Sequence, residues 1–286
     1  MSDTHFPRQS QEQQPGDEHA MRPAPEYIRN NYSPAAKLSG KCAIITGGDS
    51  GIGRAVAVHY AAEGADLVIA YRSKNEEKDA SETAALISAY GQRCELMRGD
   101  VGDSTFCSGV VERALERFGA VNILVNNAAE QYDWYDITAI PDDQLLRTFQ
   151  SNIFSHFYMA RAAVPHMGEG DVIIATSSVN AFKGNDSLID YSATKGAIQG
   201  LVRSLAQSLV DRGIRVNAVA PGPVWTPLIP ASFSAEKTAH FGGQVPMDRA
   251  AQPSEIAPAY VYLATHESSY MTGQTIHLNG GVILNT

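Results

Sequence analysis

The feature that most limits how this chain can fold is an alternation that begins at Lys41. From there to the end of the sequence, short apolar runs alternate with longer stretches that are apolar on one side only. Repeated β-α-β units produce this pattern, because their strands are buried on both faces and their crossover helices on one. The sequence therefore predicts an α/β fold with a doubly wound, seven-stranded parallel sheet. The expected strands are residues 42–46, 67–71, 94–98, 123–126, 171–177, 215–220 and 275–279.

The stretches between these runs have the length and spacing of helices. They are residues 54–63, 76–90, 105–118, 142–163, 191–212 and 253–264. The fifth carries an apolar stripe, made of Ile198, Leu201, Val202, Leu205 and Leu209. Such a stripe packs either on the sheet or against a partner helix. Between residues 220 and 248 the pattern gives way to Pro, Gly and aromatic residues, which favours a long substrate lid.

Residues 1–37 have a different composition from the rest of the chain. They are rich in Gln, Glu, Pro, Arg and Asn and show no apolar periodicity, so they cannot bury enough surface to fold alone. We expect an extended polar arm over residues 1–37 and a single domain over residues 38–286. Tyr27, Ile28 and Tyr32 are the side chains with which the arm can attach to the domain or to a neighbouring subunit.

A glycine-rich turn follows the first predicted strand. Its sequence, TGGDSGIG, leads directly into a helix. Glycines at this place let backbone N–H groups approach a pyrophosphate at the helix N-terminus, although ordinary loops also use glycine for positive φ angles. The predicted cofactor contacts in this turn are Gly47, Asp49, Ser50, Gly51, Ile52 and Gly53.

The end of the second strand bears on the choice of cofactor. An acidic side chain there would bind the ribose 2′-hydroxyl of NAD, but the sequence has Tyr71 and Arg72. A guanidinium suits a 2′-phosphate, so NADP is the preferred prediction; NAD stays possible because Glu76 and Glu77 follow closely. After the third strand, Asp100 and Val101 can contact the adenine, or Asp100 can cap the next helix.

Tyr191 and Lys195 lie four residues apart at the start of a long helix, so they share one face. A tyrosine has a pKa near 10, and a neighbouring ammonium favours its phenolate and makes it a better acid-base group. Ser178, after the fifth strand, can hold a substrate oxygen or simply cap its own turn. Asn152 lies inside a helical stretch, where asparagine is a poor helix former, which favours a specific hydrogen-bonding role.

Together these motifs resemble the short-chain dehydrogenase/reductase family over about residues 38–282. The resemblance is carried by TGGDSGIG, NNAA, the Ser178, Tyr191 and Lys195 set, and Pro221-Gly222. It implies a single Rossmann-type domain in which Ser178 polarises the carbonyl and Tyr191 is the acid or base. Lys195 would bind the nicotinamide ribose and lower the pKa of Tyr191, and Asn152 would hold a relay water. Further cofactor contacts are expected at Asn127, Ala128, Ala129, Pro221, Gly222, Val224 and Thr226.

Within the family, three features resemble one bacterial subgroup. They are the arm with Tyr27 and Tyr32, the phrase NNAAEQ and the stretch APGPVWTPLIP. The subgroup contains general stress proteins, glucose or ribitol dehydrogenase-like proteins and aldehyde reductases. Ala129 stands where much of the family has glycine, and the subgroup shares this alanine. The family also implies a homotetramer.

Charge and apolar content exclude several other classes of protein. A net charge of −9, with Lys and Arg scattered, argues against nucleic acid as a partner. No apolar run approaches membrane-spanning length and the start has no signal-peptide pattern, so we expect a cytoplasmic protein without a membrane partner. Cys42, Cys94 and Cys107 match no zinc or redox spacing, which predicts free thiols and no metal.

The sequence therefore predicts an NAD(P)-dependent oxidoreductase that acts on a small carbonyl or alcohol substrate, such as an aldehyde, ketone or polyol. The alternative is a non-catalytic nicotinamide-binding redox sensor or assembly protein. Enoyl reduction fits less well, because related enzymes with that chemistry space tyrosine and lysine farther apart. The expected pocket walls are residues 130–134, 179–190 and 220–248. Within them Trp225, Leu228 and Phe233 suit apolar contacts, and Gln131, Asn180 and Asp186 suit hydroxyls, although each can equally serve loop packing.

Overall fold

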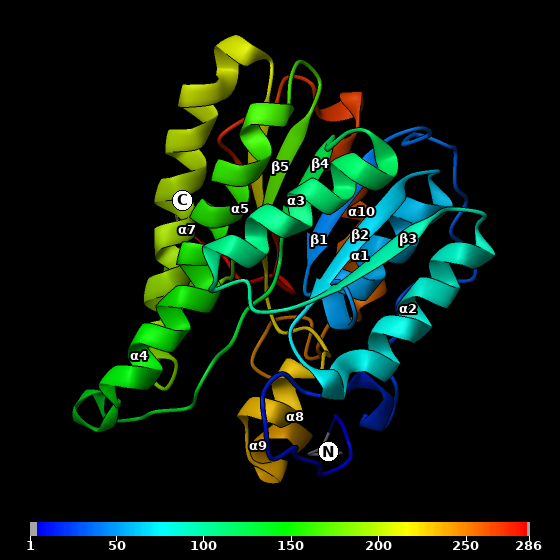
Figure 1. Ribbon diagram of the computed structural model, residues 1–286. Coiled ribbons are helices and arrows are strands. Elements are labelled where there is room, and N and C mark those ends of the chain that lie inside the picture. Colours follow the sequence, from blue (N-terminus) through cyan, green and yellow to red (C-terminus); the bar gives the residue numbers. More distant parts are fainter. Residues whose placement is uncertain (1–4, 285–286) are drawn as a thin grey trace.

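The computed structural model describes residues 5–284 and contains one seven-stranded parallel sheet (Figure 1). The strand order is β3-β2-β1-β4-β5-β6-β7, so the chain reverses direction across the sheet between β1 and β4. The expected fold class is confirmed, and the predicted strands match to within one residue at each end. The strands are β1 (Cys42–Thr46), β2 (Asp66–Tyr71), β3 (Cys94–Arg98), β4 (Ile123–Asn126), β5 (Val172–Thr176), β6 (Arg215–Pro221) and β7 (Thr275–Leu278).

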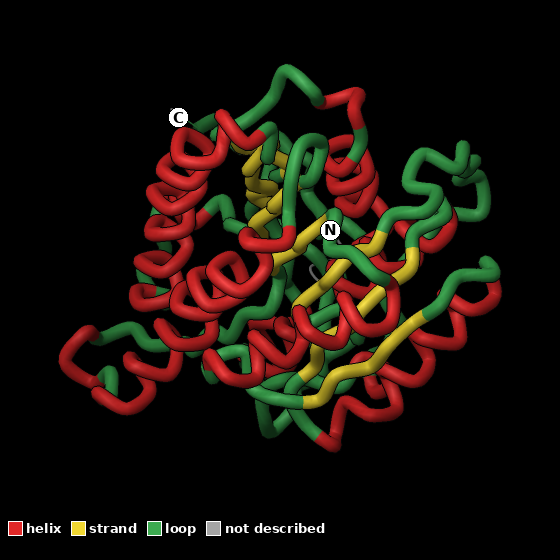
Figure 2. Tube along the Cα trace, turned by 45° about the horizontal axis from the view of Figure 1, so that its top comes forward, coloured by secondary structure: helices red, strands yellow, loops and turns green. Residues whose placement is uncertain are grey.

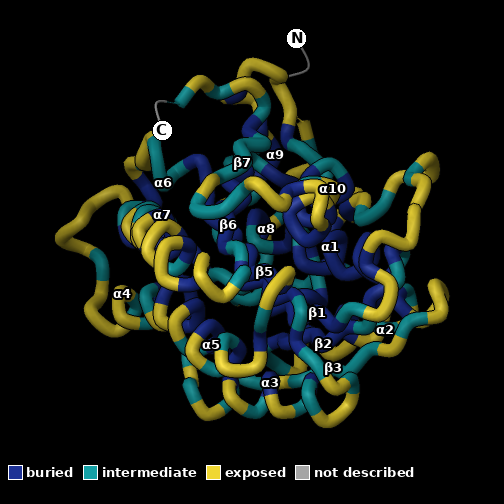
Figure 3. Tube along the Cα trace, turned by 90° about the horizontal axis from the view of Figure 1, so that it is seen from above, coloured by how far each residue is buried: buried dark blue, intermediate teal, exposed yellow. Residues whose placement is uncertain are grey.

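Helices cover both faces of the sheet (Figures 2 and 3). One apolar core joins the sheet to α3 (Ser104–Phe118), α5 (Ser155–Ala163) and α7 (Ile189–Leu209). The other core joins it to α1 (Gly51–Ala62), α2 (Glu77–Ala89) and α10 (Pro253–Ala264). The apolar stripe of α7 lies in the first core, so it packs on the sheet. Among residues 5–284, no helix combines the length and the apolar character needed to cross a membrane.

The helix expected over residues 142–163 is interrupted. The structure has α4 (Asp142–Phe149), a π-helical turn η4 (Gln150–Phe154) and then α5. The interruption contains Asn152, whose side chain is bonded to the backbone of Glu130 after β4. Single π-helical turns of this kind are frequent at functional sites. The irregular stretch between β6 and α10 contains two short helices, α8 (Leu228–Ser232) and α9 (Ala235–Ala239).

Residues 5–37 of the arm follow the surface of the domain and contain one short 3-10 turn, η1 (Glu18–Ala20) (dark blue in Figure 1). The ring of Phe6 stacks on Trp225 with 3.7 Å between centroids, and the Trp225 indole N–H donates to the Pro23 carbonyl. Tyr27 packs against the core, and the Tyr32 hydroxyl donates to Glu63. The arm therefore attaches to its own domain at several separate points.

Glu18 fixes the arm to the N-terminus of α1. Its carboxylate accepts a hydrogen bond from the Gly51 N–H at 2.5 Å and pairs with the Arg54 guanidinium at 2.7 Å. The Asp79 carboxylate accepts the backbone N–H groups of Glu18 and His19. Burial raises the pKa of Glu18 to about 7, although Arg54 acts to lower it. A buried acidic group thus ties the arm to the glycine-rich turn.

We expect Glu18→Gln to change how stability depends on pH. Between about pH 4.5 and 7 the folded protein retains a proton on Glu18 that the unfolded chain has released, so this group lowers the free energy of unfolding as pH rises. The loss amounts to about 3 kcal/mol at most. In urea unfolding measured from pH 5 to 8, the free energy of unfolding of the variant should increase relative to that of the native protein as pH rises. Parallel pH curves for the two proteins would contradict this.

Candidate active site

A pocket opens at the carboxyl ends of β1, β4, β5 and β6, where ligands bind in open α/β sheets. It brings together almost all the residues that the sequence predicted. Its wall includes Gly47, Asp49, Ser50, Gly51, Ile52, Tyr71, Arg72, Asp100, Val101, Asn127, Ala128, Ala129, Ser178, Tyr191, Lys195, Pro221, Gly222, Val224 and Thr226. Gly53 and Asn152 are the predicted site residues that lie behind the wall.

Close packing explains the place of Gly53. Gly47 and Gly51 have positive φ angles of 61° and 53°, which shape the turn. A Cβ atom on Gly53 would lie 1.8 Å from the Gly47 carbonyl oxygen. Asn127 then fixes the turn from the β4 side, since its amide donates to the carbonyls of Thr46 and Gly47. Gly53 therefore lets α1 approach the turn and does not itself face the pocket.

Asp49 has an unpaired polar atom that suits a nucleotide ribose. Its side chain is almost fully buried, it belongs to the pocket wall, and its Oδ2 atom has no hydrogen-bond partner among the described residues. Burial raises the pKa of Asp49, and the nearby Glu76 carboxylate raises it further. A ribose hydroxyl would satisfy the unpaired oxygen, because buried polar atoms in folded proteins are nearly always hydrogen-bonded.

Ser178, Tyr191 and Lys195 lie together beside this turn. The Lys195 ammonium group lies 5.4 Å from the centre of the Tyr191 ring and donates to the Thr176 carbonyl at 2.7 Å. Ser178 lines the pocket beside Tyr191, and its hydroxyl oxygen accepts the Asn180 N–H. The end of β5 and the first turns of α7 thus bring a hydroxyl, a phenol and an amine to the pocket wall.

Burial dominates the acid-base properties of this set. It raises the pKa of Tyr191 to about 12, although the neighbouring Ser178 hydroxyl acts to lower it. It lowers the pKa of Lys195 to about 7, because an ammonium without an acidic partner is costly to bury. Within the protein itself, burial therefore changes the pKa of Tyr191 more than the expected effect of Lys195 does.

Asn152 is fully buried behind Tyr191 and its side chain is fully engaged. Its Oδ1 accepts the Glu130 N–H at 2.8 Å, and its Nδ2 donates to the Glu130 carbonyl and to Thr194 Oγ1. These bonds tie the π-helical turn to the loop after β4 and to α7. The Asn152 side chain therefore fixes the positions of these three segments relative to one another.

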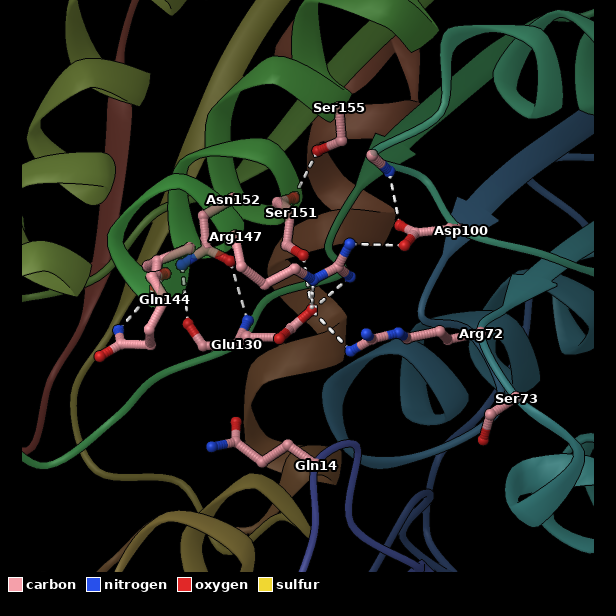
Figure 4. Close-up of polar contacts among 12 residues, drawn as sticks. Gln14, Arg72, Ser73, Asp100, Glu130, Gln144, Arg147, Ser151, Asn152 and Ser155 are labelled. Carbon is pink, nitrogen blue, oxygen red and sulfur yellow. Dashed lines mark hydrogen bonds and ion pairs between the residues drawn. The ribbon is translucent and has the colours of Figure 1, made fainter. Parts of the chain in front are cut away.

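Four charged side chains of the pocket wall form a network, and the sequence analysis had singled out two of them, Arg72 and Asp100 (Figure 4). Arg72 Nη1 lies 2.8 Å from Glu130 Oε1, and Arg147 bridges Glu130 and Asp100 at 2.5 Å each. The capping alternative for Asp100 is wrong, because Asp103 caps α3. Glu130 was expected only as a pocket wall residue and Arg147 was not singled out, since neither belongs to a spaced motif.

The wall residues expected to contact a substrate differ in part from the expectation. Leu228, Phe233, Gln131 and Asn180 line the wall, as do Lys183, Asn185, Leu188, Ile229, Phe241, Gln244 and Val245. Trp225 does not line it: this side chain is fully buried against Phe6, so its apolar role is packing. Asp186 also lies outside the wall.

The arm contributes to the same wall. Pro15 and Gly16 line the pocket, and Gly16 packs closely against the Pro227 carbonyl and against Ala231 of α8. The Gln14 side chain exchanges two hydrogen bonds with the backbone of Gln131. Nothing in the polar composition of residues 1–37 pointed to this role.

One cluster has the composition of a metal site. Oxygen and nitrogen atoms of Asp17, His19 and Asp79 lie within 4.8 Å of one another. However, Asp79 already accepts two backbone N–H groups and lies 3.4 Å from the Arg54 guanidinium, which balances its charge. We therefore assign no metal to this cluster.

The fold and this pocket define the class of protein. The family model described as Enoyl-(Acyl carrier protein) reductase matches residues 47–283, and relatives about half identical to this chain include a named dehydrogenase and a named reductase. The chain belongs to the short-chain dehydrogenase/reductase family. It is an NAD(P)-dependent oxidoreductase, as the sequence predicted.

Individual relatives confirm the predicted subgroup. General stress protein 39 of Bacillus subtilis is 52% identical over 98% of both chains. Glucose and ribitol dehydrogenase of Daucus carota is 51% identical, also over 98% of both. NADPH-dependent aldehyde reductase 1, chloroplastic, of Arabidopsis thaliana is 51% identical over 97% of this chain and 98% of that one.

A solved structure supports the same family. A short chain dehydrogenase from Burkholderia cenocepacia in complex with NADP is 30% identical with a TM-score of 0.80, and covers 86% of this chain and 98% of its own. The names of this structure and of the NADPH-dependent relative agree with the predicted preference for NADP.

We expect Gly53→Ala to weaken cofactor binding without touching the pocket wall. The added Cβ would collide with the Gly47 carbonyl, so α1 must move away from the turn. A displacement of this kind should raise the Kd of NADPH at least about tenfold, measured by nicotinamide fluorescence. The matched control is Gly109→Ala in α3, where a Cβ meets no atom within 4 Å. It should keep the native Kd, and equal losses in both variants would refute the packing argument.

Proposed function

We propose that the chain transfers a hydride between NADP and a small aldehyde, ketone or polyol. The observation that carries this proposal is the Ser178, Tyr191 and Lys195 set at one end of a pocket whose other end suits an adenosine ribose. The relatives named as an aldehyde reductase and as a glucose and ribitol dehydrogenase support this substrate class.

Three side chains would carry the chemistry of the chain itself. The nicotinamide, when bound, supplies or accepts the hydride. Ser178 would hold the substrate oxygen, and Tyr191 would donate a proton to it during reduction or remove one during oxidation. Lys195 would bind the nicotinamide ribose. In its ammonium form Lys195 would stabilise the Tyr191 phenolate, which burial alone disfavours.

Proton supply to this set would run past Asn152. The Asn152 side chain is occupied by the backbone of Glu130 and by Thr194, so we assign the relay water to its main chain in the π-helical turn. A water there would connect Lys195 with solvent and return a proton after each turnover.

Arg72 is the residue we assign to the 2′-phosphate of NADP. It follows β2 directly, lines the pocket and is partly exposed. A guanidinium can give two parallel hydrogen bonds to a phosphate, which an ammonium cannot. Asp49 and Glu76 would lie on the side of the ribose hydroxyls.

The description of the matching family model suggests enoyl reduction as a second candidate. The four-residue spacing of Tyr191 and Lys195 favours carbonyl chemistry instead.

For assembly, we propose a homotetramer in the cytoplasm. The exposed apolar side chains Leu145, Leu146, Phe154 and Phe157, on α4 to α5, suit burial against another subunit.

We predict that Tyr191→Phe abolishes turnover and retains cofactor affinity. The change removes the transferable proton and almost no volume, so the rate of NADPH oxidation with small aldehydes should fall at least about 100-fold. The Kd of NADPH should stay within about twofold by fluorescence titration. Tyr158→Phe on α5 is the control and should turn over normally. Full activity in Tyr191→Phe would exclude the proposed mechanism, whereas an inactive native protein that binds NADPH would favour the sensor alternative.

We predict that Arg72→Met weakens NADPH selectively. Removing the guanidinium should raise the Kd of NADPH about tenfold or more, because a charge-assisted hydrogen bond to the 2′-phosphate is lost. The Kd of NADH should stay nearly the same, since that cofactor carries a hydroxyl there. Equal losses for both cofactors would show that Arg72 does not recognise the 2′-phosphate.

A further inference from the structure

The Glu130 carboxylate is the centre of the charged network in Figure 4. It is 4% exposed and lines the pocket. Arg72 donates to its Oε1 at 2.8 Å, as do Arg147 Nε at 2.9 Å and Ser151 Oγ at 2.5 Å. The Tyr132 hydroxyl donates to its Oε2 at 2.8 Å. The carboxylate thus accepts hydrogen bonds from four side chains.

The charges of the network balance within the described residues. Glu130 and Asp100 supply two carboxylates, and Arg72 and Arg147 supply two guanidiniums. Burial alone would raise the pKa of Glu130, but the hydrogen bonds from Arg147 and Ser151 and the charges of both arginines lower it below its usual value. Glu130 is therefore ionised at neutral pH.

The partners of Glu130 differ in how firmly they are held. Arg147 also pairs with Asp100, and its side chain is 21% exposed. Arg72 is 36% exposed, and its only salt bridge among the described residues is to Glu130. If Arg72 turned towards a ligand, Glu130 would keep Arg147, Ser151 and Tyr132. Arg72 is therefore the partner that the carboxylate can release.

We propose that Glu130 is a specificity-determining residue: it serves as the counter-ion of Arg72 when the ribose carries a 2′-hydroxyl and competes for Arg72 with a 2′-phosphate. This inference rests on the proposed function, in which Arg72 binds that phosphate. Glu130 then lowers the affinity for NADP and leaves the affinity for NAD unchanged. The result is a site that prefers NADP and still accepts NAD.

The loop that carries Glu130 also supports the catalytic end of the pocket. The backbone N–H and carbonyl of Glu130 make both bonds to the Asn152 carboxamide. A substitution that alters only the carboxylate leaves these backbone bonds in place. Binding constants are therefore a cleaner measure of the proposal than turnover, because they are independent of the proton relay.

The test compares the Kd values of NADPH and NADH for the native protein and Glu130→Gln, measured by nicotinamide fluorescence. Gln keeps the size of the side chain and an acceptor oxygen but removes the charge. The Kd of NADPH should fall about tenfold and that of NADH should change less than about twofold. An unchanged ratio of the two constants, or weaker NADPH binding, would overturn the proposal.

A double-mutant cycle with Arg72→Met shows whether the effect acts through Arg72. In the Arg72→Met background, Glu130→Gln should no longer lower the Kd of NADPH. A gain that persists without Arg72 would overturn the proposal, because the charge would then act on the phosphate directly or through Arg147. Tyr132→Phe is the matched control: it removes a neutral donor from the same carboxylate and should leave the ratio unchanged.

Further outcomes separate this inference from the proposed function. If the native protein binds both cofactors and Glu130→Gln leaves their ratio unchanged, only the role of Glu130 fails. If the native protein binds neither cofactor, the proposed function fails and this inference with it. Should Glu130→Gln not fold, Glu130→Asp withdraws the charge from Arg72 and should shift the ratio in the same direction; an unshifted ratio there would overturn the proposal.

Discussion

Hydrogen bonding between parallel strands is the constraint on which the rest of this structure depends. It aligns β1, β4, β5 and β6 so that their carboxyl ends meet at one edge of the sheet. Asn127, which follows β4, consequently bonds to the ends of both neighbouring strands: its N–H donates to Thr46 Oγ1, and its Oδ1 accepts the Thr176 hydroxyl. The glycine-rich turn, the Tyr191 helix and the loop that contains Glu130 all begin at this edge. The pocket combines polar groups from many segments because of this topology. Every crossover returns the chain to the edge where the strands begin, so all strands end at the opposite edge, beside the pocket.

Burial then decides the chemistry available in that pocket. The Lys195 amine and the Tyr191 phenol are enclosed with no acidic partner among residues 5–284, so burial moves both pKa values towards the neutral forms. Glu130 is enclosed to a similar degree, yet two guanidiniums keep it charged. The pocket wall therefore has one group of side chains where burial disfavours charge and another where charges are paired. The first arrangement suits the proposed proton exchange with a substrate oxygen, and the second suits the proposed recognition of a nucleotide phosphate.

The N-terminal arm shows how a polar segment becomes part of a site. Its composition supplies no core, and its fixed points are polar groups or rings that meet partners on the domain: Glu18 on Gly51 and Arg54, and Phe6 on Trp225. These contacts carry Pro15 and Gly16 to the pocket wall. Contacts with the domain surface, rather than a core within the arm, offset the entropy that is lost when the arm becomes ordered.

The sequence by itself determined the order of strands and helices, the glycine-rich turn and the Tyr191 and Lys195 pair, because each is a local pattern with a fixed period or spacing. It also indicated Ser178 and Asn152 through their places after a strand and inside a helix. Only the tertiary structure decided that Trp225 packs against the arm, that Gly53 and Asn152 lie behind the pocket wall, and that Arg72, Glu130 and Arg147 form one network. Those contacts join residues from separate crossover units, and the distance between such residues along the chain bears no relation to their distance in space. No periodicity records them, so they appear only when the sheet has brought the segments together.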